Sequence, residues 1–179
     1  MKIENTLTVP LPPADALPVL LDIPFVAPCL PGTDLTREVD ARTFEGKVSL
    51  KVGPIALSFN GTATVEEIDP ETLTVLVSAR GREDRGRGSA VASVVFTLSP
   101  EGSGTKVSVV TDVTLAGAII QYARGAGIVT RTAQELVDQF AKRLAARIEG
   151  GEAPDPEAIR VGSLLWKSIK AKVTGGGAA

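Results

Sequence analysis

Strict alternation of apolar and polar side chains runs through most of the chain. Residues 2–9 alternate at every position, which is typical of a strand with one buried face. Beyond Gly32 the same period of two returns repeatedly and ends near Leu115. Turn signals such as Asp69-Pro70 separate these segments. Six or seven strands joined by short turns predict an antiparallel meander with one apolar face and one polar face.

Helical periodicity appears in two places within residues 1–150. Two short helices are predicted after the first strand, over residues 13–22 and 23–29, because prolines at 12 and 13 suit a first helical turn. A much stronger pattern begins at Val129, where apolar residues recur every three or four positions. This stripe consists of Val129, Ala133, Leu136, Phe140, Leu144 and Ile148. A helix of about 25 residues would be about 37 Å long, enough to cross the sheet.

The order of these elements predicts the architecture. A sheet with one apolar face needs a cover, and the long helix is the only large one among the predicted elements of residues 1–149. We therefore expect an α+β fold in which a curved antiparallel sheet of six to seven strands wraps around a long C-terminal helix. Residues 1–149 would form one ligand-binding domain. Residues 150–156 would be a linker, 157–173 a basic amphipathic helix, and 174–179 a disordered tail.

Composition removes several classes of function. Hydrophobic residues make up 44% and charged residues 22%, which is globular composition, and a net charge of −2 does not favour nucleic acid as a partner. The chain has no histidine and one cysteine, so the commonest general base and an intrachain disulfide are excluded. No secretory h-region and no run of 18 apolar residues is present, so we expect a cytoplasmic protein without a membrane span. Cys29 is interpreted as a buried small side chain.

The residues predicted to face the helix are small. They include Gly61, Ala63, Ala79, Ala90 and Ala92. Either a ligand fills the space that these residues leave, or they let the helix and sheet pack closely; the sequence leaves both interpretations open.

Few inward positions carry chemistry. The polar ones are Asn5, Thr111 and Tyr122, with no acid in phase on the central strands, so we predict a protein that is not an enzyme. Asn5 would hydrogen-bond either a ligand carbonyl or the backbone. The charged, glycine-rich segment 80–88 (RGREDRGRG) is interpreted as a solvated hairpin, with a docking patch for a partner as the alternative.

The segment 157–173 combines an apolar face with four basic side chains. Such a helix suits the surface of an anionic membrane, where each cation contributes about 1 kcal/mol. The residues expected to bind the membrane are Ile159, Leu165, Trp166, Lys167, Ile169, Lys170, Lys172 and Val173. A helix that docks on a partner protein, or folds back on its own domain, is the alternative.

Five motifs resemble the CoxG family, which is named for a subunit of carbon monoxide dehydrogenase, within the SRPBCC, or START and Bet v 1-like, helix-grip superfamily. They are CLPG at 29–32, KVGPI at 51–55, FNGTA at 59–63, GRGSA at 86–90 and GAGIVTRTAQELVDQF at 125–140. The resemblance implies a helix-grip fold with a central cavity. It also implies a carrier that links a cytoplasmic molybdenum carbon monoxide dehydrogenase, or a related molybdenum hydroxylase, to menaquinone or another isoprenoid quinone in the membrane. Such a protein would have no covalent cofactor and no metal, and would associate peripherally with the inner face of the cell membrane.

From the inward register and this implied cavity we expect a set of ligand contacts. They are Phe25, Leu30, Val48, Leu50, Leu57, Phe59, Val75, Val77, Ala92, Val94, Phe96, Val109, Ile119, Tyr122, Ile128, Val129, Leu136 and Phe140. Two alternatives compete with the carrier: an assembly factor that only recruits the enzyme to the membrane, and a cyclase or hydratase of the same fold, which would need inward acids or bases.

Overall fold

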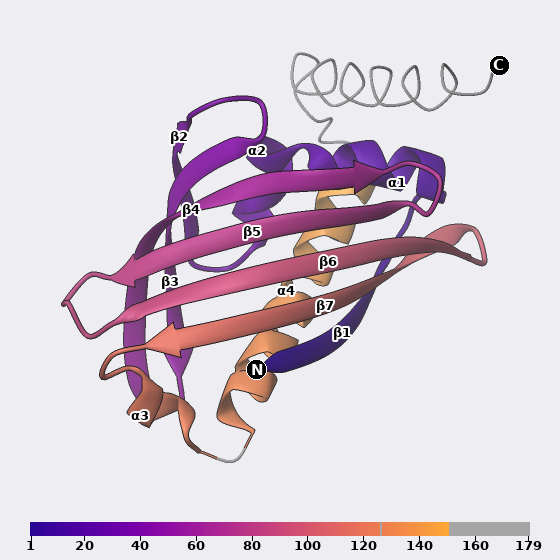
Figure 1. Cartoon of the computed structure of the whole chain (residues 1–179). Coiled ribbons are helices and arrows are strands. Elements are labelled where there is room, and N and C mark those ends of the chain that lie inside the picture. The colour runs from indigo at the N-terminus through magenta and orange to yellow at the C-terminus, as the bar shows by residue number, and fades with distance from the viewer. Residues whose placement is uncertain (126, 151–179) are drawn as a thin grey trace, which may run out of the picture.

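The computed structural model describes residues 1–125 and 127–150. It contains one antiparallel sheet of seven strands in the order β1-β7-β6-β5-β4-β3-β2 (Figure 1). The strands are β1 (Lys2–Val9), β2 (Thr33–Glu38), β3 (Thr43–Val52), β4 (Ile55–Asp69), β5 (Thr74–Glu83), β6 (Ser89–Glu101) and β7 (Gly104–Ala116). The helices are α1 (Pro13–Leu21), α2 (Ile23–Val26), η1 (Ala27–Cys29), α3 (Ile120–Ala123) and α4 (Ile128–Glu149).

The period of two in the sequence becomes one continuous inner face across the strands. Phe44 pairs with Ala63, Ala63 with Ala79, and Ala79 with Ala92, so three alanines form a row across β4, β5 and β6 that ends at Phe44 on β3. A bulge in β4 between Val65 and Glu67 adds one residue to that strand. In a regular strand, residues three positions apart point to opposite faces. Because of the extra residue, Val65 and Ile68 are three positions apart and are nevertheless both buried.

A second row on the same face marks the place where the sheet bends. Gly46 pairs with Gly61, and Gly61 pairs with Gly81. A Cβ atom on Gly61 would lie 2.1 Å from the carbonyl oxygen of Arg80, and one on Gly46 would lie 2.8 Å from that of Asp34. Two of these glycines are therefore required by close backbone approach, which a strongly curved sheet produces.

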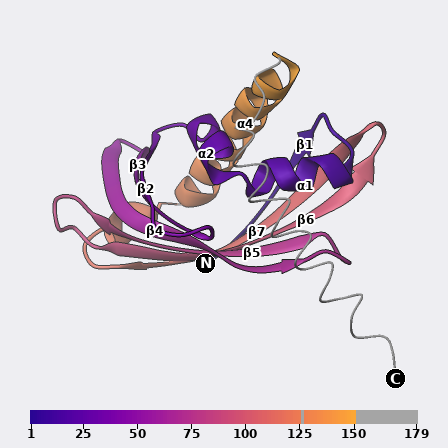
Figure 2. The same cartoon turned by 90° about the horizontal axis from the view of Figure 1, so that it is seen from above.

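The long helix α4 is preceded by Gly127, whose positive φ of 71° places it in the left-handed region. With 22 residues, α4 is about 33 Å long, slightly shorter than predicted. Its backbone packs chiefly on β1 and more sparsely on η1 and β3, and it comes close to the central strands at few points. Figure 2 shows α4 crossing the concave side of the sheet at an angle, with α1 and α2 beside it.

Two apolar clusters hold these elements together. The first cluster joins α1, α2 and η1 to strand ends and to the C-terminal half of α4, and its members include Leu17, Leu144 and Cys29. The second cluster is smaller and lies at the opposite end of the sheet, around Val52, Leu57 and Ile119. Burial of Cys29 confirms its interpretation as a small core side chain.

The predicted α+β helix-grip architecture is confirmed by the seven strands and the long C-terminal helix. The expected linker from residue 151 onward, the tail helix 157–173 and its eight membrane-binding residues lie outside the described residues. Within the described part of the chain, no helix is both long and apolar enough to cross a bilayer.

Candidate functional site

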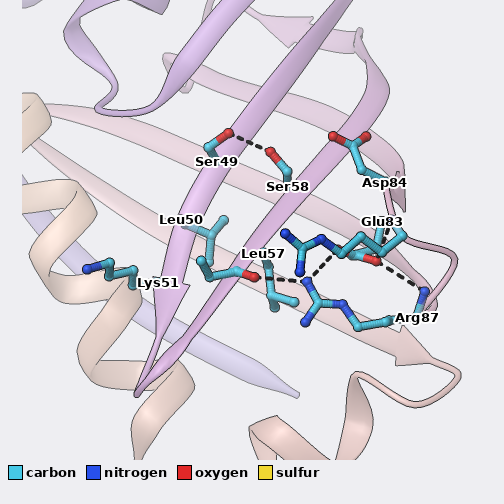
Figure 3. Close-up of a pocket in the computed structure, with 10 residues that line it drawn as sticks. Ser49, Leu50, Lys51, Leu57, Ser58, Glu83, Asp84 and Arg87 are labelled. Carbon is cyan, nitrogen blue, oxygen red and sulfur yellow. Dashed lines mark hydrogen bonds and ion pairs between the residues drawn. The ribbon is translucent and has the colours of Figure 1, made fainter.

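A hollow of about 560 Å³ opens where the β3–β4 and β5–β6 hairpins meet, and we refer to it as the end hollow (Figure 3). Leu50 and Leu57 form an apolar part of its wall, and the hydroxyl groups of Ser49 and Ser58 lie 2.6 Å apart beside them. Charged side chains line the rest of it, Lys51 from β3 and four residues from the β5–β6 hairpin. The end hollow is therefore both apolar and charged.

Glu83 is the charged residue that the sequence analysis placed wrongly. It closes β5, pairs with Phe59 on the inner register, and is buried. Both the solvated-hairpin interpretation and the expectation of no inward acid are therefore wrong for this residue. Its carboxylate accepts hydrogen bonds from the Arg87 guanidinium at 2.7 Å and from the backbone N–H groups of Arg85 and Arg87.

These bonds fix the charge states of the pair. The hydrogen bond from Arg87 is the main cause that lowers the pKa of Glu83 from 4.5 to about 2, although burial opposes it. The same contact raises the pKa of Arg87, with a smaller contribution from the neighbouring Tyr122. Arg87 also donates to the carbonyl oxygen of Ala56 at 2.9 Å, so the pair ties the two hairpins together. Glu83 is thus held ionised and is not available as a proton donor near neutral pH.

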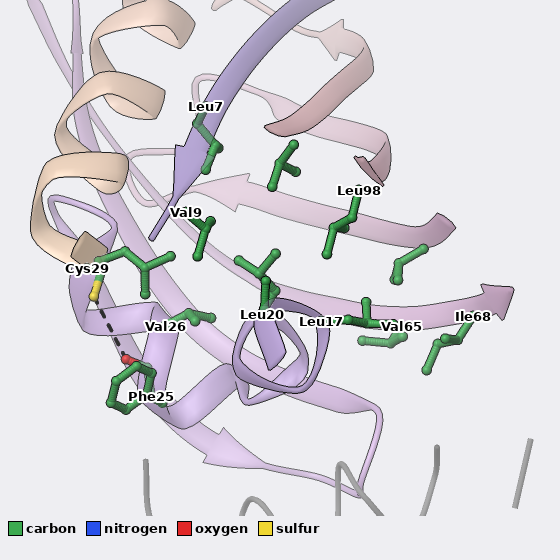
Figure 4. Packing of buried hydrophobic residues seen from close by; sticks show 14 residues of the cluster. Leu7, Val9, Leu17, Leu20, Phe25, Val26, Cys29, Val65, Ile68 and Leu98 are labelled. Carbon is green, nitrogen blue, oxygen red and sulfur yellow. Dashed lines mark hydrogen bonds between the residues drawn. The ribbon is translucent and has the colours of Figure 1, made fainter. Parts of the chain in front are cut away.

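The helix side of the inner face has a different character. The first cluster fills the end of the molecule near α1 and α2 (Figure 4), and the second cluster fills the end near α3. Between them lie apolar inner-face positions that belong to neither cluster and are only half-buried, and we refer to these as the central stretch. Its members are Val48, Ala79, Ala92 and Val94 on the sheet, with Val129 and Leu136 on α4.

A second hollow, of about 220 Å³, lies between α4 and β3, and we refer to it as the helix hollow. The CLPG turn forms part of its wall through Pro31 and Gly32, while Leu50 and Leu136 supply apolar surface. The helix hollow and the end hollow share residues 49–51, so the end of β3 lies between them. Polar side chains, among them Thr132, Glu135 and Gln139, make up much of the remaining lining. A small space of mixed polar and apolar character therefore remains on one side of the helix.

The predicted ligand contacts divide into three groups. Four are buried within the two clusters: Phe25, Leu57, Val75 and Ile119. Eight are half-buried and pack against a cluster: Leu50, Phe59, Val77, Phe96, Val109, Tyr122, Ile128 and Phe140. Six are half-buried and belong to neither cluster: Leu30, Val48, Ala92, Val94, Val129 and Leu136. Only the last group lies outside both packed clusters, and of its members Leu136 lines the helix hollow. We therefore regard it as the strongest set for ligand contact.

The Asn5 side chain bonds to a side chain of α4. Its Nδ2 donates to Gln134 Oε1 at 2.7 Å, and Gln134 Nε2 donates in turn to Asp138 Oδ1 at 2.8 Å. This chain of hydrogen bonds joins β1 to the face of α4. Asn5 therefore positions the helix that covers the sheet.

Phe25 has a similar positioning role. The Arg147 guanidinium lies 4.4 Å from the centre of its ring and donates to its carbonyl oxygen at 2.9 Å. A cation over an aromatic face is an attractive arrangement. It fixes the C-terminal part of α4 against α2.

The residues that sequence reasoning missed are polar. Ser49, Lys51 and Ser58 line the end hollow although they belong to the outer register of the β3–β4 hairpin. Thr132, a further missed residue, lines the helix hollow beside Leu136. The short β3–β4 hairpin could have predicted that Ser49 and Ser58 lie together, because residues that pair across two strands place their side chains side by side on one face.

The arrangement defines a class of protein: a curved seven-stranded sheet that grips one long helix, the helix-grip fold of START and Bet v 1-like proteins. A family model for CoxG, a subunit of carbon monoxide dehydrogenase, matches residues 6–149. The chain belongs to the CoxG family, whose name is that of an accessory subunit.

Solved structures support the fold. A conserved protein from Geobacillus kaustophilus is 16% identical with a TM-score of 0.71, and the match covers 84% of this chain and 96% of that one. A START superfamily protein from Mycobacterium smegmatis is 18% identical with a TM-score of 0.56, covering 83% and 97%. Ara h 8.0201 is 14% identical with a TM-score of 0.57, covering 84% and 99%. No match was found among curated protein sequences.

Proposed function

We propose that this protein carries a hydrophobic molecule, an isoprenoid quinone such as menaquinone, between the membrane and a carbon monoxide dehydrogenase. The observation that supports the proposal is the central stretch, where apolar side chains of the inner face stay half-buried and belong to neither packed cluster. Natural cores are close-packed, so apolar side chains that stay half-buried between two packed clusters favour a guest molecule.

The physical requirement for such a carrier is a dry surface for the isoprenoid chain. Burial of each CH₂ group is worth about 0.8 kcal/mol, so each five-carbon unit needs roughly 3–4 kcal/mol of compensation when it leaves lipid. The half-buried residues of the central stretch supply apolar surface for this purpose, and Leu50 and Leu136 add to it in the helix hollow. A narrow chain that lies along α4 between the two clusters would bury Leu136 and Val94 together with itself.

The ionisable groups of the inner face favour a carrier over an acid–base enzyme. Glu83 is the inward acid on β5, and its carboxylate is occupied by Arg87 and by two backbone N–H groups. A cyclase or hydratase would need an acid or base directed at the substrate with a pKa near the working pH. A pKa of about 2 makes Glu83 unsuited to that role.

The size of the helix hollow supports a second candidate. About 220 Å³ is below the roughly 300–1,000 Å³ of typical small-molecule sites, which favours an assembly factor that recruits the dehydrogenase without a ligand. In the carrier proposal, α4 moves away from β3 when the ligand enters. The two candidates therefore differ in whether the protein retains a lipid.

Extraction of protein purified without detergent, followed by mass spectrometry, distinguishes them. The carrier proposal predicts an isoprenoid quinone in the extract, and it predicts that added menaquinone protects the backbone amides of residues 129–136 from hydrogen exchange. Protein that is free of lipid, and whose amide exchange does not change with menaquinone, would favour the assembly factor.

A further inference from the structure

The lining of the end hollow carries positive charge that no acidic residue of the lining neutralises. Both acids of its lining are already neutralised: Glu83 by Arg87 at 2.7 Å, and Asp84 by Lys47 at 2.8 Å and by a hydrogen bond from Asn60. By contrast, the side chains of Lys51 and Arg85 make no hydrogen bond or ion pair within residues 1–125 and 127–150. Both of these cations line the hollow. Its uncompensated charge is therefore positive.

The hollow also holds hydrogen-bond donors without acceptors. Arg87 Nε is buried and has no hydrogen-bond partner among the described residues. The hydroxyl groups of Ser49 and Ser58 bond to each other at 2.6 Å, which uses one of their two O–H donors and leaves the other. A buried donor without an acceptor is costly. An acceptor-only anion with several oxygens, such as a phosphate group, would accept from the remaining seryl hydroxyl and compensate both cations of the lining.

The surroundings of the hollow indicate where such an anion comes from. Leu50 and Leu57 give it an apolar wall that continues into the second cluster. The adjoining α3 is held to the β5–β6 hairpin by a hydrogen bond from the Ile119 N–H to the Arg87 carbonyl oxygen at 3.0 Å. Next to Ile119, the side chain of Ile120 is 38% exposed. Basic groups beside exposed apolar surface are the combination that lies at the interface of an anionic membrane.

We propose that the end hollow binds the phosphate group of an anionic lipid and holds this end of the domain against the membrane surface. This assignment goes beyond the carrier function, because it gives the folded domain its own membrane contact, separate from the tail. It also orients the protein, since α3, the β3–β4 turn and the start of α4 would then face the bilayer.

Vesicle binding by the full chain tests the proposal. The test variant is Lys51→Gln with Arg85→Gln, compared on vesicles of phosphatidylcholine with and without phosphatidylglycerol. Loss of two cations is expected to weaken partitioning to the anionic vesicles by roughly 30-fold. Each cation near the surface contributes about 1 kcal/mol to binding, and about 1.4 kcal/mol corresponds to a tenfold change in affinity. The matched control removes one lysine and one arginine elsewhere, by Lys106→Gln and Arg143→Gln, and is expected to bind as the wild type does.

The outcomes separate the sources of phosphate. Equal binding by the test variant and the wild type, or an equal loss in the control, would overturn the proposal. Inorganic phosphate should release the wild type from vesicles only when it is far in excess of the lipid. Tight binding of inorganic phosphate in a protein that ignores phosphatidylglycerol would overturn the assignment to a lipid. Quinone extraction is measured on wild-type protein without vesicles, so failure of the carrier function would be seen independently.

Discussion

Ala92 offers a direct way to test whether the central stretch is unfilled. This residue is half-buried on the inner face of β6, opposite Ala79 and Val113, and belongs to neither apolar cluster. The substitution Ala92→Phe adds six carbon atoms to the space beneath α4. Its neighbour Val91 points to the outer face and is 56% exposed, so Val91→Phe is the matched control.

The sign of the stability change distinguishes a hollow from a packed interior. An added ring that enters unfilled space gains burial worth up to about 1.5–3 kcal/mol, whereas a ring forced into a packed core costs about 1–3 kcal/mol. Urea unfolding of the ligand-free protein measures this difference. We expect Ala92→Phe to be neutral or stabilising and Val91→Phe to change stability by less than about 0.5 kcal/mol.

The same substitution should compete with the ligand. A ring that displaces one five-carbon unit of an isoprenoid chain removes roughly 3–4 kcal/mol of burial, which corresponds to a few hundredfold in the Kd for menaquinone. Titration of the quinone into both variants, followed by its absorbance or fluorescence, gives the two constants. A destabilised Ala92→Phe protein that still binds menaquinone as tightly as Val91→Phe would refute the reasoning.

Three further predictions concern the framework. Leu144→Ala should destabilise the protein by about 2–5 kcal/mol in urea unfolding because Leu144 is the buried anchor of α4, while Arg143→Ala should have little effect; similar losses in both would contradict this packing. Because the pKa of Glu83 is about 2 when folded and 4.5 otherwise, its stabilisation is present above pH 4.5 and is lost as the pH falls toward 2. The stability difference between wild type and Glu83→Gln should therefore shrink over that interval, and a constant difference would disprove the link. Gly61→Ala should cost about 1–3 kcal/mol in thermal or urea unfolding, since its Cβ would meet the Arg80 carbonyl oxygen at 2.1 Å; unchanged stability would show that the strands yield there.

The sequence predicted the fold well because each strand repeats one simple pattern. With a period of two, every apolar run specifies its own face, and the stripe from Val129 to Ile148 specifies the covering helix in the same way. Only a few architectures are compatible with this order of strands and helices. The stripe that begins at Val129 also placed the start of the helix within one residue of Ile128, where α4 begins after the left-handed Gly127.

The site was harder to predict because it depends on where side chains from distant segments meet. Glycines and arginines around Glu83 resemble a solvated turn, and only the register with Phe59 and the contact with Arg87 place this acid inside. The small residues were ambiguous as well. Gly61 is needed for close backbone approach, whereas Ala92 lies in the part of the inner face that neither cluster fills.

The most direct test of the central claim is an experimental structure of the full chain with menaquinone bound. The account predicts ligand density between α4 and the middle strands, in contact with Val94 and Leu136, with the helix displaced from β3. A structure in which side chains fill that space and the quinone lies elsewhere, or does not bind, would contradict it.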